Sequence, residues 1–255
     1  MAASSLSGHC FAHRGLHNAA EGVIENSRTS IARAIAHGFG IEIDVQRSSD
    51  NVAMVFHDFE LERLTNASGL VADLPASELE DIALKNSSDR IWRMSDFLQM
   101  VDGRVPVLIE VKSDWSERLQ FVERLFVDLA AYQGVCGIMS FDPDIVSKLH
   151  SLQCEQLFGL GTTDFYSSGW GHLDAAQRAS LHNFDALNEI SVDFIAHDVR
   201  DLERAALRQV ITEYSLELLS WTVRDRTQFR CALKAKAAPI FEGEEVSALL
   251  NDKRG

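Results

Sequence analysis

Charged residues stand at the ends of three apolar segments in the first half of the chain, where a buried strand would carry Val or Leu. The segments are 11–15 (FAHRG), 41–45 (IEIDV) and 105–112 (VPVLIEVK), and their charged residues are His13, Arg14, Glu42, Asp44, Glu110 and Lys112. Any one of them could be an exposed residue or an ion-pair partner, and Glu42 could simply pair with Lys112. Their repetition at successive segments favours a shared functional site.

The acidic residues of these segments have the chemistry of a metal site. Residues i and i+2 of a strand point to the same face, so Glu42 shares a face with Asp44, and Glu110 shares a face with Lys112. Carboxylates that converge in a buried place repel one another, and without a partner they are protonated or destabilise the fold. A hard divalent cation such as Mg²⁺ or Ca²⁺ prefers oxygen ligands and resolves this conflict. We therefore predict a divalent metal ion on Glu42, Asp44 and Glu110.

A second histidine extends the pattern. The short apolar segment 52–59 (VAMVFHDF) closes on His57 and Asp58, with no helix between it and Asp44. We expect this segment to fold back beside the preceding strand as a hairpin, which leaves His57 near the same edge as His13. Imidazole titrates near neutral pH, so one histidine can take a proton from a nucleophile while the other gives one to a leaving group. The remaining histidines, such as His17, His37, His150 and His172, fall on predicted helices or loops and are interpreted as surface residues.

The positively charged residues of the three segments suit a phosphate. Arg14 offers bidentate recognition of phosphate oxygens and Lys112 offers a point charge, while a metal ion stabilises charge on the phosphoryl oxygens. These residues together predict phosphodiester hydrolysis. The net charge of −14 does not oppose an anionic substrate, because the positive field is local. The same charge argues against nucleic acid and anionic membrane surfaces as partners.

Strand-like and helix-like segments alternate along the whole chain and form eight pairs. The predicted strands are 10–15, 41–45, 105–112, 135–142, 155–161, 192–199, 216–223 and 238–243, and the predicted helices are 26–40, 94–103 (with Ser95 as its N-cap), 116–132, 144–152, 174–184, 201–214, 225–235 and 244–252. Eight such units predict a closed parallel TIM barrel, whose active face lies at the carboxyl ends of the strands. An open doubly wound sheet is the alternative, although no G-x-G-x-x-G turn follows the first strand.

The chain is predicted to form a single domain over 1–255 with one insertion. The segment of approximately 59–93 interrupts the alternation between the second strand and its helix, and in a barrel such a loop lies on the catalytic face. The four cysteines have no C-x-x-C spacing and are expected to be buried thiols. No signal-like segment and no run of roughly 18 apolar residues occurs, so we expect a cytoplasmic protein without stable membrane insertion, and leave a homo-oligomer open.

The motifs resemble those of the glycerophosphodiester phosphodiesterase family. In order, these motifs are AHRG (12–15), ENS (25–27), EIDV (42–45), VFHD (55–58), IEVK (109–112), SFDP (140–143) and WTV (221–223), and the insertion is similar to the cap of that family at Leu61, Arg63, Thr65, Gly69, Val71, Asp73, Glu78 and Leu79. The resemblance covers essentially the whole chain. Two positions depart from the family pattern. Ile24 stands where the family often has Pro, and Glu242-Gly243 stands where it usually has Thr-Asp after the last strand.

This resemblance implies a TIM barrel with a small inserted cap in the loop after the second strand. It implies an enzyme that releases sn-glycerol 3-phosphate and an alcohol from a small phosphodiester. The residues implied are Glu42, Asp44 and Glu110 for the metal, His13 and His57 as acid and base, and Arg14, Lys112 and Trp221 for the phosphate and substrate. The sequence does not choose between a cyclic-phosphate route and direct attack by water, nor between the two histidines as acid and base.

The main alternative is a related phosphodiesterase of phospholipase D type that acts on lysophospholipids or sugar phosphodiesters. The loop 161–173 carries Phe165, Tyr166 and Trp170, which could cover a headgroup or an alkyl portion, or could be ordinary loop packing. A barrel lyase or aldolase, and a barrel that only binds, are further alternatives. Neither of them needs a pair of histidines at the edge of the barrel.

Overall fold

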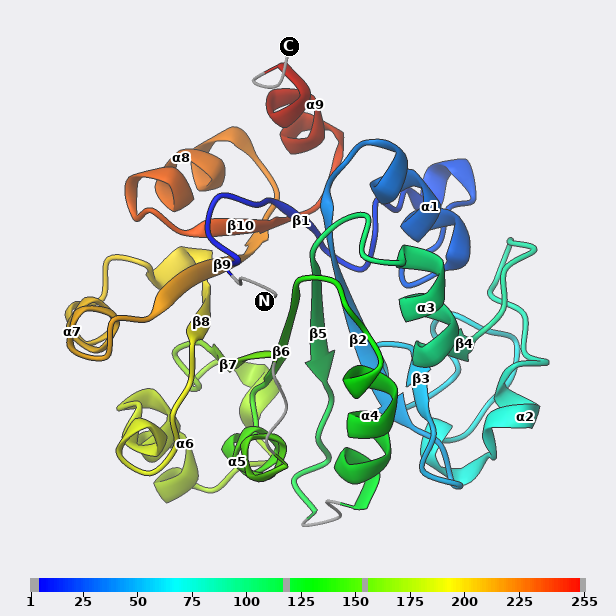
Figure 1. Ribbon diagram of the computed structural model, residues 1–255, viewed down its shortest axis with the longest axis horizontal. Coiled ribbons are helices and arrows are strands. Elements are labelled where there is room, and N and C mark those ends of the chain that lie inside the picture. Colours follow the sequence, from blue (N-terminus) through cyan, green and yellow to red (C-terminus); the bar gives the residue numbers. More distant parts are fainter. Residues whose placement is uncertain (1–4, 117–119, 153–155, 253–255) are drawn as a thin grey trace.

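A closed ring of parallel strands forms the centre of the computed structural model, which describes residues 5–116, 120–152 and 156–252 (Figure 1). Within these residues the ring has eight strands: β1 (Phe11–Ala12), β2 (Gly40–Arg47), β5 (Val107–Val111), β6 (Cys136–Ser140), β7 (Leu157–Thr162), β8 (Phe194–Asp198), β9 (Glu217–Val223) and β10 (Ala238–Phe241). β1 pairs in parallel with both β10 and β2, which closes the ring. The predicted TIM barrel is thereby confirmed, and the open sheet is excluded.

Helices surround the barrel, one after each strand of the ring (Figure 1). These helices are α1 (Arg28–Ala36), α3 (Met94–Val101), α4 (Gln120–Ala130), α5 (Pro143–Ser151), α6 (Ala175–His182), α7 (Ala205–Glu213), α8 (Arg226–Lys234) and α9 (Glu244–Asp252). Short 3-10 helices η1 (Ala19–Glu21), η3 (Ser168–Trp170), η4 (Asp185–Asn188) and η5 (Val199–Asp201) lie in the connecting loops.

Local sequence signals define several of these helix ends. Ser27 caps α1 in a reciprocal capping box with Ser30, and the side chain of Asp142 caps α5 ahead of Pro143. The predicted N-cap of α3 is wrong. That helix begins at Met94, one residue earlier than a Ser95 cap allows, because a short strand runs directly into it.

Two apolar clusters build the barrel. The larger one packs the outward faces of the strands against the helices. The smaller one lies on the inward strand faces, and its members are Leu6, Phe11, Leu108, Met139, Phe194, Ala196, Leu219, Ala238 and Ile240. The Phe194 ring needs a glycine beside it, because a Cβ on Gly159 would lie 2.2 Å from that ring. Because these side chains fill the inside of the ring, we expect the site at the carboxyl ends of the strands.

The insertion continues the sheet beside β2. β3 (Ala53–Val55) runs antiparallel to β2, and β4 (Trp92–Arg93) runs antiparallel to β3, as the expected hairpin requires. Val45 pairs with both Val55 and Val111, so β3 occupies the edge of β2 that faces away from β5. β1 leaves that edge after only two residues, since Arg14 and Gly15 both turn the backbone into positive φ.

The remainder of the insertion has an apolar cluster of its own. It holds η2 (Val71–Asp73) and α2 (Ala76–Leu79), drawn at the right of Figure 1. The cluster consists of Ile24, Met54, Phe56, Leu61, Val71, Ala76, Leu79, Leu84 and Ile91. Because these side chains pack on β3 rather than inside the ring, the insertion adds a small layer at one side of the barrel. That it acts as a cap over the site stays a prediction.

Two general expectations can be compared with the described residues. Cys136 is buried, but Cys231 on α8 is exposed, so the expectation of buried thiols is wrong there; Cys154 lies outside the described residues. In the described part of the chain, no helix combines the length and the apolar character that crossing a bilayer requires.

Candidate active site

The three predicted metal ligands converge at the carboxyl ends of β2 and β5. In the register of these strands Asp44 lies opposite Glu110, and Glu42 precedes Asp44 on the same face. All three residues are buried, and one carboxylate oxygen from each lies within 4.8 Å of the others. Glu42 Oε1 is buried without a hydrogen-bond partner, which is costly unless a cation or proton occupies the space beside it. This set of oxygen donors fits a hard divalent cation.

Positive charge surrounds these carboxylates without balancing them all. Lys112 Nζ lies 2.8 Å from Asp44 Oδ1 and forms a second ion pair with Glu110. The Arg14 side chain approaches Asp44 to 3.3 Å, while its backbone N–H donates to Glu42 Oε2 at 3.0 Å. Glu42 therefore does not pair with the Lys112 ammonium, so a simple ion pair between these two residues does not explain the charge of Glu42.

The pKa values of the two β2 carboxylates move in opposite directions. Burial, together with the charges of Asp44 and Glu110, raises the pKa of Glu42 well above its usual range. Burial alone would also raise the pKa of Asp44, but Lys112, His57 and Arg14 lower it below its usual range. A divalent cation would remove this conflict, because it favours the ionised form of every carboxylate around it.

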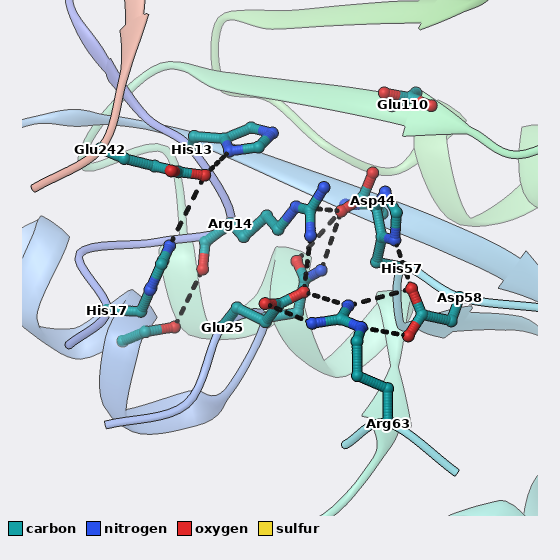
Figure 2. Close-up of polar contacts among 12 residues, drawn as sticks. His13, Arg14, His17, Glu25, Asp44, His57, Asp58, Arg63, Glu110 and Glu242 are labelled. Carbon is teal, nitrogen blue, oxygen red and sulfur yellow. Dashed lines mark hydrogen bonds and ion pairs between the residues drawn. The ribbon is translucent and has the colours of Figure 1, made fainter. Parts of the chain in front are cut away.

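His13 lies on the barrel side of this cluster. Its backbone N–H donates to Phe241 O at 2.9 Å, and its ring Nδ1 lies 2.5 Å from Glu242 Oε1 (Figure 2). The other ring nitrogen, Nε2, lies 3.9 Å from Glu42 Oε2. Burial lowers the pKa of His13, and the hydrogen bond with Glu242 only partly offsets that effect. Arg224 Nε holds the second oxygen of Glu242 at 2.8 Å.

His57 lies on the insertion side, in the loop after β3. Its Nδ1 lies 2.6 Å from Asp58 Oδ1, and Gln46 holds its backbone carbonyl at 2.8 Å. Arg63 donates to both oxygens of Asp58 and to both oxygens of Glu25 (Figure 2). Burial would raise the pKa of Asp58, but the hydrogen bonds from His57 and Arg63 hold it below its usual range.

A cavity of about 420 Å³ joins these groups. It is lined by the predicted residues His13, Arg14, Glu42, His57, Glu110, Lys112 and Trp221. Asp44 is fully buried and is not among the lining residues, so the structure sets it behind the cavity wall. The Trp221 indole donates to Ala196 O at 2.9 Å, which fixes its ring at the opposite wall.

Aromatic rings form the wall that faces the charged groups. Phe141 stands in the middle, with ring centroids 5.1 Å from Trp170 and 5.4 Å from Trp221. Both of these neighbours line the cavity. The three aromatic residues of loop 161–173 differ in their exposure. Phe165 is buried behind Trp170, whereas Tyr166 is exposed to solvent. Of these three residues, Trp170 forms part of the aromatic wall, which continues to Trp221 on β9.

The sequence by itself predicts no individual role in the site for Glu25, Asn26, Asp58, Arg63, Arg224 or Glu242. Asn26 is buried at positive φ, and its side chain donates to Asp44 Oδ2 at 2.9 Å. The sequence held a signal for part of this set, since Glu25 and Asn26 fall in a motif of the family and Asp58 follows His57 directly. Glu242 stood out only as a departure from the family pattern, and its partner lies at the other end of the chain.

The expectation that the remaining histidines are surface residues fails most clearly at His197, and His17 is also less exposed than expected. His197, at the end of β8, is fully buried, and its Nδ1 hydrogen-bonds with the Thr162 hydroxyl at 2.7 Å. His17 is half-buried, and its Nε2 lies 4.0 Å from Glu242 Oε1. Strand and loop positions near a barrel rim are packed more closely than sequence polarity suggests.

The sequence matches a family model over most of its length. The model is described as the glycerophosphoryl diester phosphodiesterase family, and it matches residues 13–242. Human glycerophosphodiester phosphodiesterase 1 is 22% identical over 239 residues, which cover 83% of this chain and 70% of the human protein. A glycerophosphodiester phosphodiesterase of Caldanaerobacter subterraneus is 33% identical over 110 residues, which cover 40% of this chain and 44% of that protein.

Solved structures share the fold. A phosphodiesterase of Oleispira antarctica, in complex with the product sn-glycerol-3-phosphate, aligns with a TM-score of 0.76 and 18% identity over 97% of each chain. The glycerophosphodiester phosphodiesterase of Thermotoga maritima aligns with a TM-score of 0.70 and 18% identity over 96% of this chain and 99% of its own. At such identities the likeness speaks for the fold alone.

Proposed function

Because the chain belongs to the glycerophosphoryl diester phosphodiesterase family and is a hydrolase, we propose that it cleaves glycerophosphodiesters to sn-glycerol 3-phosphate and an alcohol. The observation that carries the proposal is one cavity at the open end of the barrel, in which His13 and His57 flank a buried cluster of carboxylates. The product named in the Oleispira structure is consistent with it. A single catalytic domain with segment 59–93 as its cap is part of the same proposal.

The proposed cofactor is a divalent metal ion, Mg²⁺ or Ca²⁺, held by Glu42, Asp44 and Glu110. When bound, such an ion supplies positive charge against the charge that develops on the phosphoryl oxygens. Arg14 and Lys112 line the same cavity and add cationic groups for phosphate. In the described structure Lys112 pairs with Asp44 and Glu110, so neutralising these carboxylates would free its positive charge for an anionic substrate, whereas Arg14 also pairs with Glu25 at 2.7 Å.

The two histidines are proposed to move the protons of the reaction. Hydrolysis forms a bond from an attacking oxygen to phosphorus and breaks the bond to the alcohol oxygen. One histidine accepts the proton of the attacking hydroxyl or water, and the other donates a proton to the departing alcohol. His13 and His57 each have Nδ1 against a carboxylate, which leaves Nε2 of each ring available for this exchange.

A lysophospholipid substrate is the second candidate. The aromatic wall of Phe141, Trp170 and Trp221 favours it, because this wall offers apolar surface to an alkyl portion beside the phosphate position. Cleavage of the same phosphodiester bond would then release a lysophosphatidate and the headgroup alcohol. Only the substituent on the glycerol differs between the two candidates.

A substrate panel tests the proposal. Purified protein is incubated with glycerophosphodiesters of several headgroups and with lysophospholipids, in Mg²⁺, in Ca²⁺ or in EDTA, and release of glycerol 3-phosphate, lysophosphatidate and alcohol is followed. We expect glycerol 3-phosphate release that EDTA abolishes and a divalent ion restores. Absence of release with every metal and substrate contradicts the proposed activity, while release of lysophosphatidate alone supports the second candidate.

A further inference from the structure

The register of the barrel strands brings together His13, Glu242 and Arg224, which are far apart in the sequence. Phe241 on β10 pairs with Ala12 on β1 and with Val223 on β9. One residue further on, the backbone N–H of His13 donates to Phe241 O, and that of Glu242 donates to Val223 O. His13, Glu242 and Arg224 therefore stand side by side where three neighbouring strands end.

Glu242 has a partner for each of its two oxygens. Oε1 lies 2.5 Å from His13 Nδ1, and Oε2 accepts from Arg224 Nε at 2.8 Å (Figure 2 shows the first contact). An ionised carboxylate can only accept hydrogen bonds, so the proton at this contact belongs to His13 Nδ1. The other ring nitrogen, Nε2, lies on the side of Glu42, 3.9 Å from its Oε2.

The charge states agree with this geometry. Burial would raise the pKa of Glu242, but the hydrogen bond from His13 and the charge of Arg224 lower it to about 2. An ionised carboxylate held beside Nδ1 is the arrangement that selects one tautomer of a neutral imidazole.

We infer that Glu242 is a positioning residue for His13, which fixes the ring orientation and keeps the proton on Nδ1 so that Nε2 can exchange a proton with the substrate. The inference deepens the proposed function and rests on it for the role of His13. It gives a task to a residue that stands where the family usually has Thr-Asp. The contact of His57 with Asp58, at 2.6 Å, shows the same device on the other side of the cavity.

Steady-state kinetics of Glu242→Gln provide the first test. An amide can donate to Nδ1 as well as accept, so the variant no longer selects the tautomer. We expect kcat to fall by about 10- to 100-fold, as for other groups that orient a reacting imidazole, with KM changed by less than about threefold. Glu245→Gln, an exposed carboxylate on α9, is the matched control and should keep wild-type kcat.

A double variant separates positioning from general stabilisation. In a His13→Ala background, Glu242→Gln should cause no further loss of kcat, because the residue acts through the ring that is gone. Losses that multiply would overturn the inference. Thermal unfolding of each variant shows whether a fall in kcat accompanies a fall in stability.

Nitrogen NMR of the histidine rings in the metal-free protein tests the inference without turnover. With the His13 signal assigned by its absence in His13→Ala, we expect the ring proton on Nδ1 in the wild-type protein and a shift toward the Nε2–H tautomer in Glu242→Gln. A wild-type proton on Nε2 would overturn the inference. A protein that shows the expected tautomers but releases no product in the substrate panel would instead contradict the proposed function.

Discussion

The two sides of the cavity carry the same chain of contacts, built in different ways. On the barrel side, Glu242 is hydrogen-bonded by Arg224 and contacts His13. On the insertion side, Asp58 is hydrogen-bonded by Arg63 and contacts His57. His13 and Glu242 are 229 positions apart and meet through strand register, whereas His57 and Asp58 are neighbours in sequence. A rigid barrel and a local loop can thus present the same chemical device to one site.

The two histidines also differ in their surroundings. The His13 side chain is 10% exposed and that of His57 is 29% exposed. The backbone of His13 is anchored by its hydrogen bond to Phe241 on β10, while His57 lies in a loop whose Asp58 is hydrogen-bonded by Arg63. Burial strengthens the electrostatic contacts of the first and leaves the second more open to solvent. We expect the barrel side to be the more rigid of the two.

The largest effect is expected where the two sides meet, at the carboxylate cluster. Glu42→Gln should lower kcat by about 10³-fold or more, since a metal ion supplies several kcal/mol of charge stabilisation and each ~1.4 kcal/mol is tenfold in rate. Release of glycerol 3-phosphate at saturating Mg²⁺ measures it, with Glu245→Gln as control. A folded variant with wild-type turnover would mean that the metal assignment is wrong.

The second effect compares the two histidines directly. His13→Ala and His57→Ala should each lower kcat by about 10²-fold or more if both move protons. A nitrophenyl ester of glycerophosphate, whose leaving group departs without protonation, should restore turnover in whichever variant lacks the general acid. If turnover is restored in one variant only, the histidine replaced in that variant is the general acid and the other is the general base. Equal restoration in both, or in neither, would break the division into acid and base.

A smaller loss of kcat is expected from replacing either of the two arginines, Arg63 and Arg224. Arg63 makes contacts with both Asp58 and Glu25, while the Arg224 side chain is 57% exposed and holds only Glu242 in the described contacts. Arg63→Ala should therefore lower kcat by about tenfold. Arg224→Ala should lower it by less than about threefold, because exposed ion pairs contribute little. If the order of the two losses were reversed, the barrel side would be the one that depends on its arginine.

A further effect concerns acid stability rather than turnover. Burial would raise the pKa of Glu25, but Arg63 and Arg14 lower it to about 2 in the folded protein, below its ordinary value near 4.5. A lowered folded-state pKa contributes stability that is present above pH ~4.5 and lost as pH falls toward ~2, by at most about 3 kcal/mol. The melting temperature, measured in EDTA over this pH range, should fall more steeply with decreasing pH for the wild-type protein than for Glu25→Gln. Identical slopes would show that this ion-pair network does not couple to folding.

Much of the insertion side could be predicted from the sequence. The short apolar segment that begins at Val52 closes on His57-Asp58, with no helix between it and Asp44, which predicts a hairpin beside β2, and the structure has β3 there. The partners within this stretch are local, so their contact follows from chain connectivity. The contacts of Arg63 could not be predicted, because its two carboxylate partners, Asp58 and Glu25, come from different loops, and a pattern of residue types does not show which loops meet.

The barrel side was predicted only in part. The position of His13 at a strand end followed from the alternation of apolar segments. Its contact with Glu242 did not, because nothing in either segment sets which residue of the last strand lies beside which residue of the first. The Lys112 contacts with Asp44 and Glu110, rather than with Glu42, depend in the same way on the register of two strands.

The sequence by itself determined the kind of fold, the order of the elements and the residue types at each strand end, because hydrophobic period and strand alternation are properties of short segments. It also determined that Glu42 and Asp44 share a face, and that His57 adjoins Asp58. Only the tertiary structure decided which strand ends meet: ring closure sets β1 between β10 and β2. That closure depends on the packing of the whole chain, and it alone brings Glu242 to His13.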